Sequence, residues 1–429
     1  MTRLYAQLEA LESAGEAVSV AIVGVGRMGH SLAVASQYVD GVAVTTLADI
    51  RTDRAREAAA EIGHTDDEIA RVETAAEADE ARANGQVVVT ADGMVPTEMA
   101  DVDAVIGATG VPDIGAQVAV RSIFNGKHVI MLTDETDAAV GPYLSALAAS
   151  AGVVYSGAAG DEPGAIMELY DFARSLGFEV LAAGKGKNNP LDRQATPETL
   201  ADEADGKGLN PEIYTAFVDG TNSMLEMTMV ANATGLGVDT RGLHGPEVGS
   251  VDELSEVFTT EAEGGILSRT GVVDYALGGG VAPGVFVVVT SDSEKIRADL
   301  EYLKMGMGPN FVLHRSFHIP TQEPLLTAAR AELYGDANIV PQAPVADTVA
   351  VAKRELTAGE EIDGIGGETV YGLAENADVA REETLVPISL LSGATLERNV
   401  EAGEALTHDD VAFQQGELYH LRKLQESHF

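Results

Sequence analysis

Two lysines in one glycine-rich segment are the residues whose chemistry stands out first. Lys185 and Lys187 lie in residues 184–190 (GKGKNNP), directly after the apolar run 178–183, and Asn188 follows them. The chain has 68 acidic and 27 basic residues, so a close lysine pair indicates an anionic or carbonyl ligand. An ammonium group stabilises the negative charge that develops on a carbonyl oxygen during reduction, and it can supply the proton. The alternative is a purely structural loop.

Acidic side chains form a second set of candidates. Asp161 and Glu162 lie in a turn before an apolar helix, where capping the helix is the alternative role. Asp219 leads into a further predicted helix, on which Asn222 and Glu226 are four residues apart and share a face. We expect Asp161, Glu162 and Asp219 to orient a substrate or to hold a metal ion.

A phosphate-binding fingerprint lies near the N-terminus. Gly24, Gly26 and Gly29 form G-x-G-x-x-G, with Arg27 and Met28 between the last two glycines, and they connect an apolar run to a predicted helix. In this pattern the first glycine permits a tight turn, the second admits the pyrophosphate, and the third lets helix and strand pack closely. The helix N-terminus adds free N–H groups. The segment therefore predicts a dinucleotide-binding site.

The residues beyond the fingerprint leave NAD and NADP as alternatives. Asp49 follows the second predicted strand and is placed to bind ribose hydroxyls, which favours NAD. Arg51 and Arg54 are candidates to accept the 2′-phosphate of NADP, or are simply solvated. We expect Ala108, Thr109 and Gly110, after the fourth predicted strand, to lie near the nicotinamide.

Other chemistries find no support in the residues. The chain has no cysteine, which excludes disulfides, a thiol nucleophile and thiolate metal sites. There is no H-E-x-x-H, G-x-S-x-G or G-x-x-x-x-G-K-[ST] motif, so hydrolase and kinase functions are not indicated. His244 is interpreted as a hydrogen-bonded loop residue, with a place in the site as the alternative.

The formal net charge of −41 argues against nucleic acid and anionic lipid as partners. It also suggests adaptation to concentrated salt, where screening relieves self-repulsion. No apolar run approaches the roughly 18 to 20 residues of a membrane span, and the N-terminus lacks a signal-peptide pattern. We therefore expect a cytoplasmic protein that acts on a small molecule.

Apolar runs that alternate with helical stretches predict an α/β fold, a Rossmann-type doubly wound parallel sheet. The expected strands cover residues 18–23, 42–48, 86–90, 104–107, 128–131 and 152–155. We expect a Rossmann domain in residues 1–157, an α+β catalytic and dimerisation domain in residues 158–340, a small β-rich domain in residues 341–415, and a helical tail in residues 416–429.

Several motifs resemble those of predicted homoserine dehydrogenases with a C-terminal SAF domain, whose best-known branch is the deoxyxylulose phosphate reductoisomerase-like (DRL) oxidoreductases. The resemblance rests on residues 23–29, 160–164, 183–189, 219–221, 243–246 and 302–306, and on the Gly-Glu turns near the C-terminus. It implies a small β-clip, a homo-oligomer (dimer or tetramer), and a reduced nicotinamide cofactor that acts on a sugar or polyol phosphate or a hydroxy-carbonyl compound. It also implies a divalent cation. The family pattern suggests a lysine where this chain has Asn222, so a phosphate contact at that position is not expected.

These patterns together predict an NAD(P)-dependent oxidoreductase, in a simple or reductoisomerase form, in which Lys185 and Lys187 polarise a carbonyl. Two alternatives stay open: homoserine dehydrogenase, and a non-catalytic protein that senses the cofactor.

Overall fold

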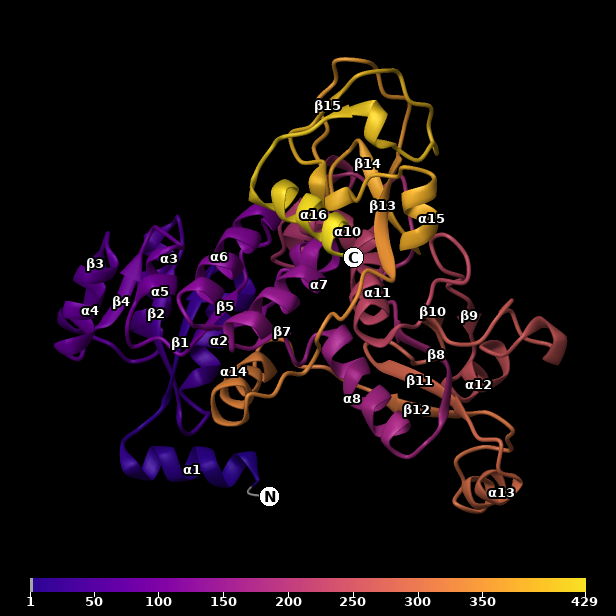
Figure 1. The fold of residues 1–429 in the computed structure, drawn as a ribbon, viewed down its shortest axis with the longest axis horizontal. Coiled ribbons are helices and arrows are strands. Elements are labelled where there is room, and N and C mark those ends of the chain that lie inside the picture. Colours follow the sequence, from indigo (N-terminus) through magenta and orange to yellow (C-terminus); the bar gives the residue numbers. More distant parts are fainter. Residues whose placement is uncertain (1–2) are drawn as a thin grey trace. The chain divides into compact units, whose positions relative to one another are not determined.

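The computed structural model describes residues 3–429 and divides into two compact units. The first unit comprises Met1–Gly164, Ile319–Val340 and His420–His428, and the second comprises Ala165–His318, Pro341–Tyr419 and Phe429. Figure 1 shows the elements of both units in sequence colours.

The first unit is built on a seven-stranded sheet in the order β3-β4-β2-β1-β5-β6-β7. Every neighbouring pair is parallel, which confirms the predicted doubly wound fold. The strands are β1 (Val18–Val23), β2 (Val42–Ala48), β3 (Ile69–Val72), β4 (Val87–Thr90), β5 (Ala104–Gly107), β6 (His128–Met131) and β7 (Tyr155–Gly157). Strand β3 was not predicted, and β7 begins where the expected strand 152–155 was to end.

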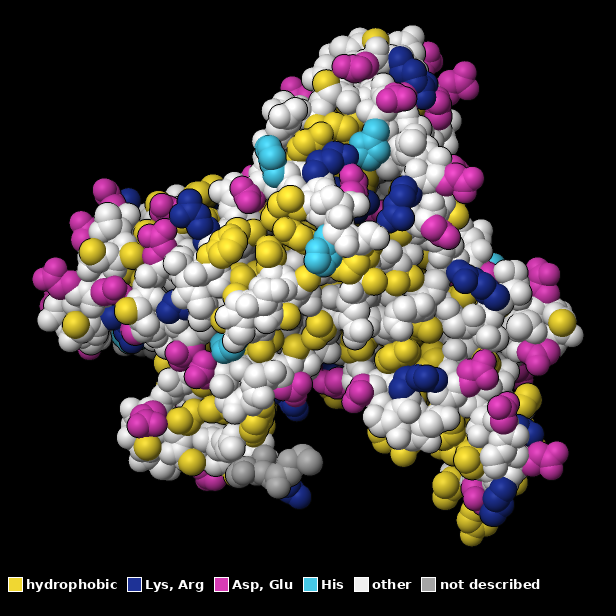
Figure 2. Space-filling view, viewed as in Figure 1, with side chains coloured by type: hydrophobic (Ala, Val, Ile, Leu, Met, Phe, Trp, Pro, Cys, Tyr) yellow, Lys and Arg dark blue, Asp and Glu magenta, His cyan; other side chains and the backbone are white. Residues whose placement is uncertain are grey.

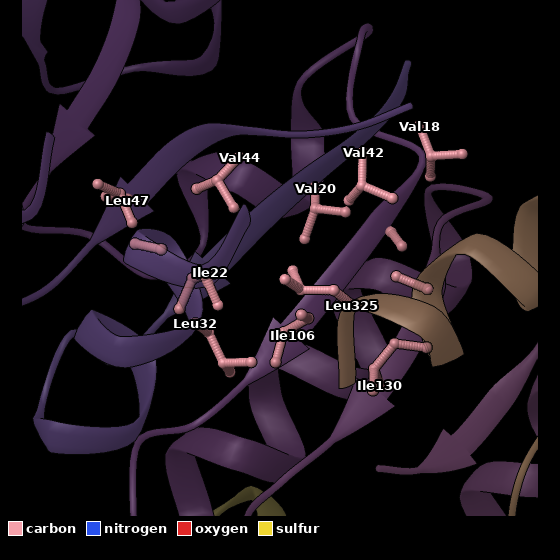
Figure 3. Packing of buried hydrophobic residues seen from close by; sticks show 14 of the residues in the cluster. Val18, Val20, Ile22, Leu32, Val42, Val44, Leu47, Ile106, Ile130 and Leu325 are labelled. Atoms are coloured by element: carbon pink, nitrogen blue, oxygen red, sulfur yellow. The ribbon is translucent and has the colours of Figure 1, made fainter. Parts of the chain in front are cut away.

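Helices cover both faces of this sheet because successive strand residues point to opposite sides. Ile22 packs in a cluster with Leu32 and Leu325, whereas its neighbours Ala21 and Val23 belong to the cluster on the opposite face. Figure 3 shows the first cluster, with side chains from β1 and β2 directed toward it. The helices are α1 (Leu4–Ala14), α2 (Arg27–Ser36), α3 (Thr52–Glu61), α4 (Ala75–Ala83), α5 (Val95–Glu98), α6 (Pro112–Phe124) and α7 (Asp134–Ala151).

Two later helices complete the first unit. Helix α14 (Glu323–Tyr334) packs against β5 and β6 and appears in orange among the indigo and purple elements of Figure 1. Helix α16 (Glu417–His428) is tied to α7 by Gln425, whose Nε2 donates to Ala139 O at 3.0 Å. The compact units thus join segments that the predicted boundaries separate, and the four predicted domain ranges stay predictions.

The second unit contains a mixed five-stranded sheet in the order β12-β11-β8-β10-β9. Helices α8 and α11 contribute to the core on one face, and α12 contributes to the core on the other. The elements of this sheet and its helices are α8 (Glu162–Ser175), β8 (Glu179–Gly186), α9 (Pro197–Gly206), α10 (Pro211–Val218), α11 (Thr221–Thr234), β9 (Glu247–Val248), α12 (Leu254–Val257), β10 (Val272–Gly278), β11 (Val285–Thr290), α13 (Glu294–Tyr302) and β12 (Phe311–Arg315).

A hairpin of β13 (Ala346–Ala352) and β14 (Val370–Asn376) packs on α11. It is followed by α15 (Ala377–Glu382) and by the short pair β15 (Thr395–Leu396) and β16 (Val411–Ala412). The Thr228 and Thr348 hydroxyls lie 2.8 Å apart between α11 and β13. The β-rich segment therefore shares a core with the sheet of the second unit.

Acidic side chains are scattered over the face drawn in Figure 2, as the net charge of −41 predicts. None of the helices within residues 3–429 combines the length and the apolar character that a membrane crossing requires.

Candidate functional site

The three fingerprint glycines have three different surroundings in the first unit. Gly24 has a φ of +98°, and a Cβ there would lie 2.4 Å from Ala108 O. A Cβ on Gly29 would lie 2.0 Å from Gly24 O, so helix and strand need this glycine to pack. A Cβ on Gly26 would meet no atom within 4 Å. The open space beside Gly26 lies at the first turn of α2, where the fingerprint predicts that a pyrophosphate group approaches the backbone.

Asp49 supports the fingerprint turn from the end of β2. Its Oδ2 accepts the Val25 N–H at 2.8 Å and its Oδ1 accepts the Arg51 N–H at 2.8 Å. Each carboxylate oxygen has a second lone pair, so Asp49 can still accept a ribose hydroxyl. The side chain of Arg51 is exposed and that of Arg54 is half-buried. The choice between NAD and NADP stays open.

The loop after β5 lies beside the fingerprint. Ala108, Thr109 and Gly110 follow β5, and β1 lies between β2 and β5 in the sheet. Strand order reverses at β1 and β5, and parallel sheets hold ligands at such a point. Helix α2 starts at Arg27 with no side-chain cap, and Arg27 and Met28 are exposed. The predicted cofactor residues of the first unit are therefore gathered at one edge of the sheet.

Asp161 and Glu162 also belong to the first unit. Asp161 is half-buried and its Oδ1 accepts the Glu162 N–H at 3.1 Å, while Glu162 is the first residue of α8. A role in helix initiation and a role in ligand binding both fit this position.

A series of hydrogen-bonded polar side chains lies in the second unit. Lys185 Nζ donates to Glu226 Oε2, and Asn222 Nδ2 donates to Glu226 Oε1 at 2.5 Å. Lys185 and Glu226 are both buried. The predicted shared face of Asn222 and Glu226 on one helix is confirmed by this contact.

The position of Lys185 corrects one expectation. Residues 184–186 were expected in a glycine loop, but β8 continues through Gly186. Lys185 is in register with Tyr275 of β10 and with Val285 of β11, so strands pair with it on both sides. The glycines permit this pairing because Cβ atoms at Gly184 and Gly186 would lie 2.1 Å and 2.2 Å from neighbouring backbone. Of the three predicted catalytic residues in this segment, Lys187 and Asn188 lie beyond the end of β8, and Asn188 is exposed.

Lys187 is buried, and its Nζ donates to the carbonyl oxygen of Phe217 at 2.5 Å. Burial lowers the pKa of Lys187 to about 8, with repulsion from Lys185 as the next cause. Glu226 and Asp219 act in the opposite direction on this pKa. An ammonium group with a pKa near 8 donates a proton readily at neutral pH.

Asp219 pairs with a residue that the sequence did not indicate. Its Oδ2 lies 2.8 Å from Lys353 Nζ, and both side chains are buried. Its Oδ1 accepts the Thr221 N–H at 2.9 Å, so Asp219 also satisfies the first N–H group of α11. Burial raises the pKa of Asp219, and the charge of Lys353 opposes this rise. A direct role of Asp219 toward substrate or metal stays a prediction.

Two further groups shape the neighbourhood of β10. The carboxylate of Asp274 accepts the backbone N–H groups of His244, Gly245 and Tyr275 at 2.8 to 3.1 Å, and burial raises its pKa to about 6. His244 Nε2 lies 2.8 Å from Asp239 Oδ2, which confirms a hydrogen-bonded loop histidine. Asp274 carried no motif that could have singled it out.

Two segments of the chain match known protein families. Residues 160–323 match the family described as oxidoreductase DRL, catalytic domain, and residues 347–412 match the SAF domain. The match to the catalytic domain identifies the class of protein as an oxidoreductase. The two matches confirm the predicted family, that of DRL oxidoreductases that carry a SAF domain, and they confirm that the chain is an enzyme.

Similar solved structures include a probable dehydrogenase from Thermotoga maritima, at 15% identity and a TM-score of 0.42, covering 76% of this chain and 91% of that one. A 1-deoxy-D-xylulose 5-phosphate reductoisomerase from Zymomonas mobilis is 19% identical with a TM-score of 0.38, and the match covers 50% of this chain and 58% of that one. A scyllo-inositol dehydrogenase from Lactobacillus casei is 13% identical with a TM-score of 0.38, and the match covers 70% of this chain and 76% of that one. No curated protein matches the chain by sequence.

Proposed function

We propose that the protein uses NAD or NADP to reduce, or in reverse to form, the carbonyl group of a small hydroxy-carbonyl compound or of a sugar or polyol phosphate. The observation that carries this proposal is the pair of buried lysines, Lys185 and Lys187, within the segment that matches an oxidoreductase catalytic domain. Burying two ammonium groups is costly, and oxidoreductase chemistry gives them a use.

The first unit supplies the cofactor half of this function. The open space at Gly26, the uncapped start of α2 and the carboxylate of Asp49 are suited to pyrophosphate and ribose. A bound nicotinamide supplies or accepts a hydride.

The second unit supplies the charge and the proton. During reduction, negative charge grows on the carbonyl oxygen as the carbon gains a hydride, and Lys185 and Lys187 stabilise that oxygen. Lys187 gives its proton to the oxygen to form the alcohol and is reprotonated from solvent. Glu226 holds Lys185 in place by accepting a hydrogen bond from its ammonium group. Asn222 in turn fixes Glu226 by donating to the other carboxylate oxygen.

A carbonyl panel assayed with NADH and NADPH, over a range of salt concentrations, tests this function. We expect Lys185→Ala and Lys187→Ala each to lower turnover by about 10²-fold or more. Lys295→Ala is the matched control, because Lys295 is exposed and pairs with Asp299 on the same helix, α13. Full turnover in both site variants would exclude the proposed roles. If the protein binds the cofactor but converts none of the compounds in the panel, the result would instead support the non-catalytic, cofactor-sensing alternative.

Several finer features belong to the same proposal. A reductoisomerase form of the reaction, a divalent cation held through Asp161, Glu162 and Asp219, adaptation to concentrated salt, a homo-oligomer and a cytoplasmic location all stay predictions. Metal analysis of the purified protein and light scattering across salt concentrations test the metal and the oligomer.

A further inference from the structure

Arg193 is a cation of the second unit that the sequence analysis did not single out. It lies between β8 and α9, and its guanidinium carbon stands 5.1 Å from the centre of the Tyr371 ring. Its Nη1 is buried and donates to no acceptor among residues 3–429. A Cβ on Gly242 would lie 3.5 Å from its Nη2, so the guanidinium also borders the loop before His244.

An unused, buried N–H group on a cation costs free energy, so the position of Arg193 requires an explanation. Stacking on Tyr371 holds the plane of the guanidinium without using any of its N–H donors. The ring comes from β14, within the segment that matches the SAF domain. The stacked guanidinium therefore keeps its donors available for a ligand.

The charges around Arg193 favour an anion. Neither Arg193 nor Lys187 forms an ion pair with a carboxylate within the described part of the chain. The two are close enough for Arg193 to contribute to lowering the pKa of Lys187. The two acids that raise the pKa of Lys187 are already paired, Glu226 with Lys185 and Asp219 with Lys353. Arg193 and Lys187 are thus two neighbouring cations that no carboxylate pairs in the part of the chain that the structure describes.

We propose that Arg193 is a specificity-determining residue of the second unit and binds an oxyanionic group, phosphoryl or carboxylate, carried by the carbonyl substrate. The planar guanidinium matches two oxygens of such a group at once. Lys187 adds a point charge beside it. The identity of the ligand as a substrate rests on the proposed function, but anion binding itself does not.

Calorimetric titration of the full-length protein with inorganic phosphate and, separately, with acetate tests the site. The titrations are made without cofactor, and the potassium chloride concentration is adjusted so that the total ionic strength is the same throughout. We expect one of the two anions to bind, and Arg193→Gln to weaken that binding about tenfold or more, because a charge-assisted contact is lost. The anion that binds distinguishes a phosphoryl from a carboxylate substrate.

Four variants make the outcome specific. Arg193→Lys keeps the charge and should retain part of the affinity, whereas Tyr371→Leu removes the ring and should weaken binding, with Tyr371→Phe restoring it. Arg381→Gln is the control, because Arg381 is an exposed arginine on α15 of the same unit. Unchanged anion affinity in Arg193→Gln, or no binding of either anion to the parent protein, would overturn the proposal. Arg193-dependent binding without any turnover would contradict only the proposed reaction.

Discussion

Lys353 and Asp219 form a buried ion pair that joins the segment matching the SAF domain to the segment matching the DRL catalytic domain. The Lys353 ammonium lies 2.8 Å from Asp219 Oδ2 and donates to the carbonyl oxygens of Ala195 and Gly367 at 2.7 Å each. Asp219 in turn accepts the first N–H group of α11, the helix that carries Glu226. The SAF segment therefore helps to hold the helix that positions Lys185.

Removing one partner of this pair should destabilise the second unit. We expect Lys353→Met to lower the free energy of unfolding by about 3 to 5 kcal/mol, because a buried carboxylate is left without its cation. The double variant Lys353→Met with Asp219→Asn should recover part of this loss. Denaturant unfolding at constant salt measures both variants, and equal stability of the single and double variants would argue against the pair.

The fingerprint glycines should separate cofactor binding from folding. Gly26 has an ordinary φ of −74° and open space, so Gly26→Val should leave stability nearly unchanged while it blocks the pyrophosphate. Gly24→Ala should destabilise the first unit, because its Cβ would overlap the backbone of Ala108 at a φ of +98°. Thermal unfolding and the fluorescence of bound NADH and NADPH measure the two effects. Normal cofactor affinity in Gly26→Val would place the dinucleotide elsewhere.

The pKa of Lys187 sets an expectation for the pH profile. Carbonyl reduction needs the protonated ammonium, so kcat/KM should fall as the pH rises above about 8. The charge of Glu226 raises the pKa of Lys187, and Glu226→Gln should therefore shift this alkaline limb to lower pH. Steady-state rates from pH 6 to 10 measure the shift. A limb that stays in place in Glu226→Gln would show that another group titrates.

Asp137 should contribute to the pH dependence of stability. It is fully buried in the first unit, its Oδ2 accepts the Tyr155 hydroxyl at 2.9 Å, and burial raises its pKa from 3.8 to about 7. The folded state keeps this proton over a range in which the unfolded chain has lost it. The contribution to stability is therefore fully present below pH 3.8 and is lost as the pH rises through about 7.

The full change corresponds to about 4 kcal/mol. Unfolding free energies of the parent protein and of Asp137→Asn, compared from pH 4 to pH 8 at constant salt, isolate this contribution. We expect the parent protein to lose more stability than the variant over this interval. Parallel curves for the two proteins would mean that Asp137 does not titrate in this range.

The sequence was sufficient wherever the determining contacts are local. The fingerprint glycines, the strand before them and the helix after them lie within one short stretch, and the atom that a Cβ on Gly29 would meet, Gly24 O, lies in the same stretch. The doubly wound fold followed from alternating strand and helix patterns, since side-chain periodicity is a local property. Strand β3 was missed because only one of its four residues is fully buried.

Tertiary structure decided what depends on partners far along the chain. The Gly-Lys-Gly pattern at 184–186 indicates a loop by local propensity, yet pairing with β10 and β11 extends the strand through it. The partners of Asp219 and Arg193, Lys353 and Tyr371, come from a different segment and carry no motif. Local sequence determined that the chain has a dinucleotide fingerprint and a lysine pair. Long-range packing decided which charges are neutralised and which remain for a ligand, because burial and pairing are properties of the assembled fold.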